Sequence, residues 1–211
     1  MILGNICTRS CGFCGVQTGR PDTVDWAEPE KVGRSIKIMG IKHAVITSVD
    51  RDDLPDQGTI IWVETVQAIR RMNPNTTLET LIPDFQGRED LLDRIVTVAP
   101  EVVSHNMETV RRLTRAVRIQ AKYDRSLEVL RYLKQEGVQR TKSGLMLGLG
   151  ETEDEVIESM EDLRNANVDI ITLGQYLQPS KKHLPVAEFI TPEQFKKYEI
   201  LGKEMGFRHV E

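Results

Sequence analysis

The sequence of 211 residues predicts an α/β fold, a partial (β/α)6 barrel of the TIM-like type, from three observations. An apolar run, a polar segment with glycine and an amphipathic helical pattern follow one another about six times along the chain. Two of these runs, 43–49 and 169–177, are apolar on both faces, as burial in a parallel sheet beneath helices requires. Chemically reactive residues follow nearly every run, which favours a barrel mouth over an open sheet with one switch point.

The expected strands coincide with the apolar runs. The first is MILGN at the start of the chain, and the second, HAVITSV, leads into the charged residues 50–53. Later runs lead into the segments PDF, HNMET, LGLGET and GQYLQPS. FRHVE at 207–211 has the pattern of a further strand that is cut short. The complete set of expected strands is 1–5, 43–49, 76–85, 101–107, 141–149 and 169–177.

Amphipathic patterns predict helices between the strands. One start carries a capping box, Thr152 followed by Glu155. Another has Thr191 as its cap, with Pro192 in the first turn and Gln194 at the third position. The expected helices are 29–39, 59–72, 88–98, 124–136, 153–166 and 192–205.

Length and charge indicate one domain over residues 1–211, since a chain of this size buries a sufficient core without disulfides. The net charge of −4 argues against nucleic acid as the main partner. The start lacks a basic segment followed by a long apolar one, and no run approaches the roughly 18 apolar residues of a membrane span. We therefore expect a cytoplasmic protein without a membrane partner.

All three cysteines of the chain, Cys7, Cys11 and Cys14, lie within eight positions of one another. In a reducing compartment such a group indicates metal or redox chemistry more often than disulfides. The C-x3-C-x2-C spacing suits three irons of a [4Fe–4S] cluster and leaves the fourth iron free to bind a small molecule. Two alternatives stay open: a zinc site completed by His105 or His183, and three unliganded thiols.

The segment CTRSCGFC resembles the C-x3-C-x-aromatic-C signature of radical S-adenosylmethionine enzymes, with Phe13 as the aromatic residue. More narrowly, the chain resembles the lipoyl synthase family along essentially its whole length. The segments that carry this resemblance, in order, are MILGNICTRSCGFCGVQTGRP, VITSVDRDDLPD, LIPDFQG, HNMETV, TKSGLMLGLGET, GQYLQPSKKHLPV and GFRHV.

The resemblance implies a barrel of the radical SAM type and a sulfurtransferase of lipoate biosynthesis. In that family the three cysteines hold a [4Fe–4S] cluster, and S-adenosylmethionine binds the open iron by its amino and carboxylate groups. One electron cleaves S-adenosylmethionine to methionine and a 5′-deoxyadenosyl radical. The radical abstracts hydrogens from C6 and C8 of an octanoyl chain on a lysine of a lipoyl-carrier protein, and sulfur enters at both carbons. The implied partners are therefore an octanoylated carrier domain and an external electron donor.

Further candidate cofactor-binding residues lie at the expected strand ends, and each has an ordinary structural alternative. For the hydroxyls after the second strand, the alternative to cofactor binding is a charged turn. For the polar residues of HNMET, it is a buried core network. A lysine and a glycine-rich segment precede the fifth helix, where solvation and a simple turn are the alternatives. Tyr176 and Leu177 stand at the end of the sixth strand, where packing is the alternative. The candidates are Phe13, Thr47, Ser48, Asn106, Glu108, Lys142, Met146, Tyr176 and Leu177.

The chain departs from the lipoyl synthase pattern in one respect. The family carries a second, auxiliary [4Fe–4S] cluster as its sulfur source, bound by cysteines that precede the barrel and a serine in a carboxyl-terminal Arg-Ser-Ser-Tyr motif. Neither set occurs in this sequence. We therefore expect a core truncated at both ends that does not complete sulfur insertion by itself. Two other functions stay open: a different radical SAM reaction on a small substrate, and a non-enzymatic zinc- or thiol-binding domain.

Overall fold

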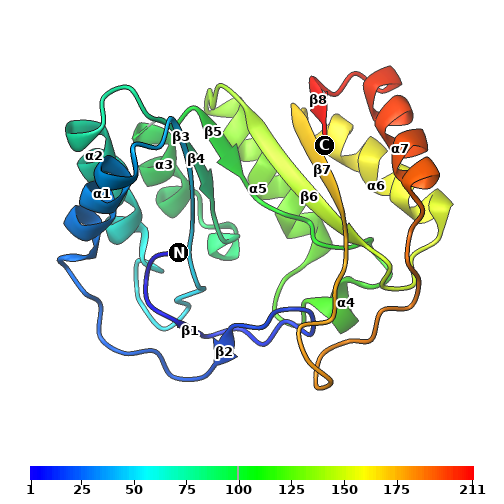
Figure 1. The fold of residues 1–211 in the computed structure, drawn as a ribbon, viewed down its shortest axis with the longest axis horizontal. Coiled ribbons are helices and arrows are strands. Elements are labelled where there is room, and N and C mark those ends of the chain that lie inside the picture. The colour runs from blue at the N-terminus through cyan, green and yellow to red at the C-terminus, as the bar shows by residue number, and fades with distance from the viewer. Residues whose placement is uncertain (99) are drawn as a thin grey trace.

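The computed structural model describes residues 1–98 and 100–211, and its centre is a six-stranded parallel sheet. The strands lie side by side in chain order, β3-β4-β5-β6-β7-β8, so the sheet winds in one direction as in a barrel (Figure 1). This arrangement confirms the predicted parallel α/β fold. The strands are β3 His43–Thr47, β4 Thr77–Leu81, β5 Val102–Ser104, β6 Thr141–Leu147, β7 Ile170–Gln175 and β8 His209–Val210.

Helices follow the strands and lie along the outer side of the curved sheet (Figure 1). The two predicted caps are present: Thr152 and Glu155 form a complete capping box, and the Thr191 side chain accepts a hydrogen bond from the Gln194 amide. Two short elements, α4 and the 3-10 helix η1, were not predicted. The helices are α1 Glu28–Met39, α2 Thr59–Met72, η1 Phe85–Gly87, α3 Glu89–Thr97, α4 Thr114–Val117, α5 Tyr123–Gln135, α6 Glu153–Asn165 and α7 Pro192–Glu204.

The prediction of a first strand over 1–5 is wrong. Only Ile2 pairs with the sheet, through a single parallel bridge to Ser48 beyond the end of β3. The backbone then leaves the extended conformation, because Leu3 and Gly4 have φ values of 68° and 94°. The sixth strand of the sheet is instead β8, which pairs with β7 and lies within the predicted 207–211 segment.

Two apolar clusters fill the space between the sheet and the helices. The first gathers side chains around Trp62, Phe85 and Leu91, and the second gathers side chains around Met160 and Ile171. Helix α5 contributes to both, with Val129 and Leu133 in the first cluster and Leu127 and Leu130 in the second. The two halves of the sheet are therefore connected by one helix. Among the described residues, no helix is long and apolar enough to cross a membrane.

The carboxyl ends of β3 to β7 point to the same side of the molecule. The amino-terminal segment, with the two-residue strands β1 Ile6–Cys7 and β2 Gln17–Thr18, crosses this side beneath the strand ends (Figure 1). The fold therefore places the three cysteines at the predicted mouth.

Candidate active site

The first half of the cysteine-bearing loop is fixed to the end of β3. The Cys7 sulfur accepts hydrogen bonds from the backbone amides of Arg9, at 3.4 Å, and Asp50, at 3.3 Å. The Thr8 amide and hydroxyl donate to the Asp50 carbonyl oxygen at 3.1 and 3.0 Å. The amides of Arg9 and Asp50 favour the thiolate, which is the form that binds iron, but burial outweighs them and raises the pKa of the Cys7 thiol.

The second half of the loop is held by two other segments. The Gly12 amide donates to the Val117 carbonyl at 2.9 Å, and the Gly12 carbonyl accepts from the Leu184 amide at 3.0 Å. His183 Nε2 lies 2.9 Å from the Cys14 carbonyl oxygen. A Cβ on Gly12 would lie 3.0 Å from Leu184 Cδ1, so this close approach favours glycine. The loop after β7 thus clamps the backbone between Cys11 and Cys14.

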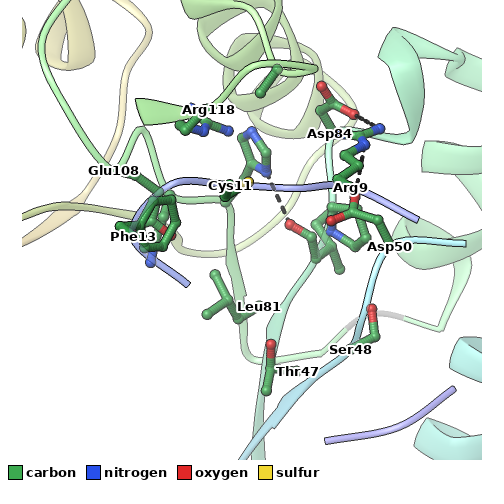
Figure 2. A pocket seen from close by; sticks show the side chains of 15 residues that line it. Arg9, Cys11, Phe13, Thr47, Ser48, Asp50, Leu81, Asp84, Glu108 and Arg118 are labelled. Atoms are coloured by element: carbon green, nitrogen blue, oxygen red, sulfur yellow. Dashed lines mark hydrogen bonds and ion pairs between the residues drawn. The ribbon is translucent and has the colours of Figure 1, made fainter. Parts of the chain in front are cut away.

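A pocket opens beside Cys11 at the carboxyl ends of the strands, and its side chains are drawn in Figure 2. Six of the residues predicted from the sequence line it: Cys11, Phe13, Thr47, Ser48, Asn106 and Glu108. The other residues that line it are Arg9, Asp50, Leu81, Ile82, Pro83, Asp84, His105, Arg118 and Ala121.

The buried Arg9 side chain, 6% exposed, connects the loop to two strand ends. It forms a bidentate ion pair with Asp52, with nitrogen–oxygen distances of 2.7 and 2.8 Å. It also donates to Asp84 at 2.7 Å and lies 3.3 Å from Asp50 Oδ1. Figure 2 shows Arg9 between Asp84 and Asp50. The charged residues after β3 therefore hold the cysteine loop, a role that sequence reasoning did not assign to them.

Burial and charge act in opposite directions on these carboxyl groups. Burial raises the pKa of Asp84, but the Arg9 guanidinium outweighs it and holds that pKa well below its usual range. Burial dominates at Asp50, whose pKa is raised in spite of Arg9. Burial, together with the nearby Asp50, also raises the pKa of the Cys11 thiol to about 12. A cation bound at the cysteines would lower this pKa and stabilise the thiolate of Cys11.

Two polar groups that line the pocket are not fully compensated by neighbouring protein groups. The Ser48 hydroxyl oxygen is buried and has no hydrogen-bond partner. Burial raises the pKa of Glu108, although Arg118 and a hydrogen bond from Asn106 oppose the shift. Buried polar groups are normally satisfied, so an unpartnered hydroxyl in a pocket that a buried carboxyl also lines indicates a place for a polar ligand. These residues fit a ligand with amino and hydroxyl groups, as S-adenosylmethionine has.

His105 and Arg118, which also line the pocket, belong to a buried network. His105 Nδ1 lies 2.9 Å from the Ile82 carbonyl oxygen and Nε2 lies 2.9 Å from Ser126 Oγ. Arg118 donates to the Met107 carbonyl at 2.6 Å. Burial, followed by the charge of Arg118, lowers the pKa of His105 to about 4. The imidazole is therefore neutral at pH 7, with both of its nitrogens in use.

Besides Cys7 and Cys14, four predicted cofactor-binding residues lie outside the pocket lining. Lys142 is the second residue of β6, where its Nζ lies 3.4 Å from Glu79 Oε1. The Met146 amide donates to the Glu108 carbonyl at 2.9 Å, so the backbones of these two residues lie side by side. The Tyr176 hydroxyl donates to the Leu184 carbonyl at 2.7 Å, and the neighbouring Leu177 is 67% exposed.

The three cysteines suit an iron–sulfur cluster better than a zinc ion. Within 1–98 and 100–211, no three His, Cys, Asp or Glu side chains converge in a way that could hold one metal ion. His105 uses both ring nitrogens in the core, and His183 contacts the Cys14 carbonyl and Ser180 instead of a cysteine sulfur. A loop with a cysteine at every third or fourth position can bring its thiolates to separate iron corners of a cubane cluster.

Comparison with known proteins agrees with this chemistry. The profile of the Radical SAM superfamily matches residues 1–163. The chain is 83% identical over its whole length to the lipoyl synthase of Flavobacterium psychrophilum and spans 73% of that protein. It is 80% identical to the mitochondrial lipoyl synthase of Nematostella vectensis and spans 72% of it.

Solved structures show the same fold at low sequence identity. Methylornithine synthase (PylB) superposes on the whole chain with a TM-score of 0.75 at 17% identity, and the chain spans 62% of that protein. The similarity to PylB concerns the fold alone, whereas the sequence relatives share most of their residues with this chain. The chain therefore belongs to the lipoyl synthase family of the radical SAM superfamily.

Proposed function

We propose that residues 1–211 form the radical SAM core domain of a lipoyl synthase, which inserts sulfur at C6 and C8 of a protein-bound octanoyl-lysine. The observation that carries the proposal is the cysteine loop fixed beside a pocket with an unpartnered Ser48 hydroxyl. The cluster, when bound, supplies the electron that cleaves S-adenosylmethionine. The protein residues hold the reactants, orient them and keep water away.

Each residue near the pocket has a proposed role. Cys7, Cys11 and Cys14 are the ligands of the [4Fe–4S] cluster. Thr47 and Ser48 offer hydroxyls to the methionine part of S-adenosylmethionine, and the Glu108 carboxyl with the Asn106 amide receives its ammonium or ribose hydroxyls. Phe13 lines the pocket next to the cysteines. We also propose cofactor contacts for four residues that do not line the pocket: Lys142, Met146, Tyr176 and Leu177.

The proposed reaction needs partners and a sulfur source. The substrate is the octanoylated domain of a lipoyl-carrier protein, and an external donor supplies electrons. The sulfur comes from an auxiliary [4Fe–4S] cluster, for which the 211 residues contain no further cysteines. We therefore propose that these residues bind the first cluster and cleave S-adenosylmethionine, and that they do not insert sulfur unaided.

The test is anaerobic reconstitution with iron and sulfide, followed by addition of S-adenosylmethionine and a reductant. We expect 5′-deoxyadenosine from the wild-type chain and none from the Cys11→Ala variant, which should keep its fold. Mass spectrometry of an octanoylated carrier domain then detects hydrogen abstraction and separates this reaction from one on a small substrate. Stoichiometric zinc without labile sulfide, or cleavage by Cys11→Ala, would contradict the proposal.

A further inference from the structure

We propose that Arg9 is a positioning residue, whose guanidinium fixes the cysteine loop in its ligand-holding form before a cluster binds. The inference rests on the proposed role of Cys7 and Cys11 as cluster ligands. Arg9 lies between these two cysteines in the sequence, and its side chain turns away from them into the strand ends.

The guanidinium joins three segments that are far apart in the chain. Its Nε and Nη2 contact both carboxylate oxygens of Asp52, in the segment after β3. Nη2 also contacts Asp84, after β4 and 75 residues from Arg9. A planar group with fixed donor directions makes these contacts together, whereas a lysine ammonium is a point charge. The anchor therefore depends on the shape of arginine as well as on its charge.

Burial makes this anchor rigid. Arg9 is 6% exposed and Asp84 is fully buried, so neither charge can exchange its partner for water. Removing one member of a buried ion pair leaves the other charge without compensation. Asp84 is itself fixed by the Gln86 amide at 3.0 Å and by Arg125 at 3.3 Å. The loop is thus tied to a carboxylate that the fold holds in place.

The backbone of Arg9 transmits this position to a cysteine. The Arg9 amide donates to the Cys7 sulfur at 3.4 Å, so the orientation of this residue sets one of the hydrogen bonds on that sulfur. Hydrogen bonds around ligand atoms orient them and tune the metal group. A loosened Arg9 would therefore misplace a hydrogen bond at Cys7.

The chain supplies a matched control in Arg51 and its partner. Arg51 is 4% exposed and forms the same kind of bidentate ion pair, with Asp53 at 2.9 Å for both contacts. It also donates to the carbonyls of Leu3 and Asp22. None of these contacts involves residues 7–14. Asp52 and Asp53 are neighbours, and their side chains are 23% and 35% exposed.

The experiment compares Arg9→Lys with Arg51→Lys, and Asp52→Asn with Asp53→Asn, in the full chain. Deuterium uptake of the metal-free protein reports on the peptide that covers residues 7–14, and circular dichroism gives the melting temperature. After anaerobic reconstitution, iron release to a chelator is followed. We expect Arg9→Lys to speed deuterium uptake and iron release by roughly tenfold, as for other residues that support metal ligands.

The controls separate positioning from general stability. Arg51→Lys and Asp53→Asn should lower the melting temperature to a similar degree but leave uptake at 7–14 and iron release within about twofold of wild type, since a structural pair alone does not move these readouts. Should Arg9→Lys fail to fold, the comparison of Asp52→Asn with Asp53→Asn decides, because the Arg9–Asp84 pair remains. Equal iron release and equal deuterium uptake in the two variants of a pair would overturn the inference.

A wild-type chain that takes up no iron would refute the proposed function. Deuterium uptake of the metal-free protein would still decide whether Arg9 holds the loop.

Discussion

The Ser48 hydroxyl and the His105 imidazole both lie at the pocket, but their surroundings differ. Ser48 Oγ has no hydrogen-bond partner, whereas both ring nitrogens of His105 have one. An unpartnered buried hydroxyl costs stability, and burial together with the charge of Arg118 opposes proton uptake by the His105 imidazole. The first is thus open to a ligand and the second responds to pH.

Ser48→Ala is expected to weaken S-adenosylmethionine binding without lowering stability. Removal of one hydrogen bond to the ligand should raise the Kd by roughly 3- to 10-fold. Because Ser48 Oγ has no protein partner, the free energy of unfolding should stay within about 1 kcal/mol of wild type. Equilibrium binding to the reconstituted protein and urea denaturation measure the two effects.

Thr80→Val is the control for this change. The Thr80 hydroxyl is also buried and unpartnered, but Thr80 does not line the pocket. Its replacement should leave the Kd unchanged. If both variants weakened binding equally, the Ser48 hydroxyl would have no specific role.

His105 is expected to make the protein less stable in acid. Its pKa is lowered from 6.5 to about 4 in the folded state, so the unfolded chain binds more protons between these values. The stabilisation is complete above about pH 6.5, is lost as the pH falls towards 4, and amounts to on the order of 3 kcal/mol.

Urea unfolding between pH 7.5 and 4.5 tests this prediction. The His105→Gln variant removes the titrating group and keeps a polar side chain, while Asp84, Arg118 and Arg9, which face His105, are unchanged. The free energy of unfolding of the variant should fall less steeply than that of wild type. Parallel curves would assign the acid sensitivity to the carboxylates instead.

Strand ends were the best guide to the site, because parallel strands bring their carboxyl ends together. Thr47, Ser48, Asn106 and Glu108, which were predicted in this way, line the pocket. Lys142 was placed at the mouth as well, but it is near the amino end of β6, where it reaches Glu79. The contact between Arg9 and Asp84 spans 75 residues, and no local pattern in the sequence carries such a signal.

At the scale of elements, the turn between β6 and α6 is tightly enclosed. Gly148 has a φ of 99°, and its amide and carbonyl contact Glu151 and the segment 187–188. A Cβ at this position would overlap the Glu188 carbonyl oxygen and the Gln175 side-chain nitrogen. The loop after β7 therefore depends on glycine for its approach to the end of β6.

Gly148→Ala is expected to lower the free energy of unfolding more than Gly137→Ala. Both glycines have positive φ, 99° and 88°, so both variants should lose about 1–2 kcal/mol from backbone strain. Gly137 has open space around it, whereas Gly148 is enclosed and should lose a further 1–3 kcal/mol or so by overpacking. Urea denaturation measures both losses, and equal values would show that the loop yields freely.

Capping chemistry made helix starts predictable, as the capping box at Thr152 and the side-chain cap at Thr191 confirm. The conformation of residues 1–5 was not predictable. MILGN is apolar like a strand, but its departure from extended backbone at Leu3 depends on contacts elsewhere in the chain. Arg51, for example, donates to the Leu3 carbonyl from a position 48 residues away. Apolar character predicted the burial of Ile2 and Leu3 but not their conformation.

At the scale of the whole molecule, the sheet and α5 link the two apolar clusters. The sheet order could be inferred in outline, since alternating strands and helices produce parallel neighbours. Which segment supplied the sixth strand could not be inferred, because both termini offered short apolar runs. We expect the two halves to unfold together, because Leu127 and Val129 pack on opposite clusters from the same helix.

Leu130→Ala tests this cooperativity in a chain in which the exposed Trp26 is replaced by phenylalanine. Leu130 belongs to the second cluster, and its truncation should cost roughly 2–5 kcal/mol. Trp62, buried in the first cluster, reports on the other half by fluorescence. We expect its unfolding midpoint to shift together with that from circular dichroism, and not to shift in the control Glu128→Ala. An unchanged Trp62 transition in Leu130→Ala would show that the halves unfold independently.

The contact between Cys14 and His183 joins positions 169 residues apart. During protein synthesis the cysteines leave the ribosome long before their clamp exists, by roughly 10–30 s at elongation rates of about 5–20 residues per second. Throughout that interval only the strands that have already been synthesised can hold the loop that carries the three thiols. Assembly of iron and sulfide at these thiols in their final geometry is consequently an event that follows translation of the segment after β7.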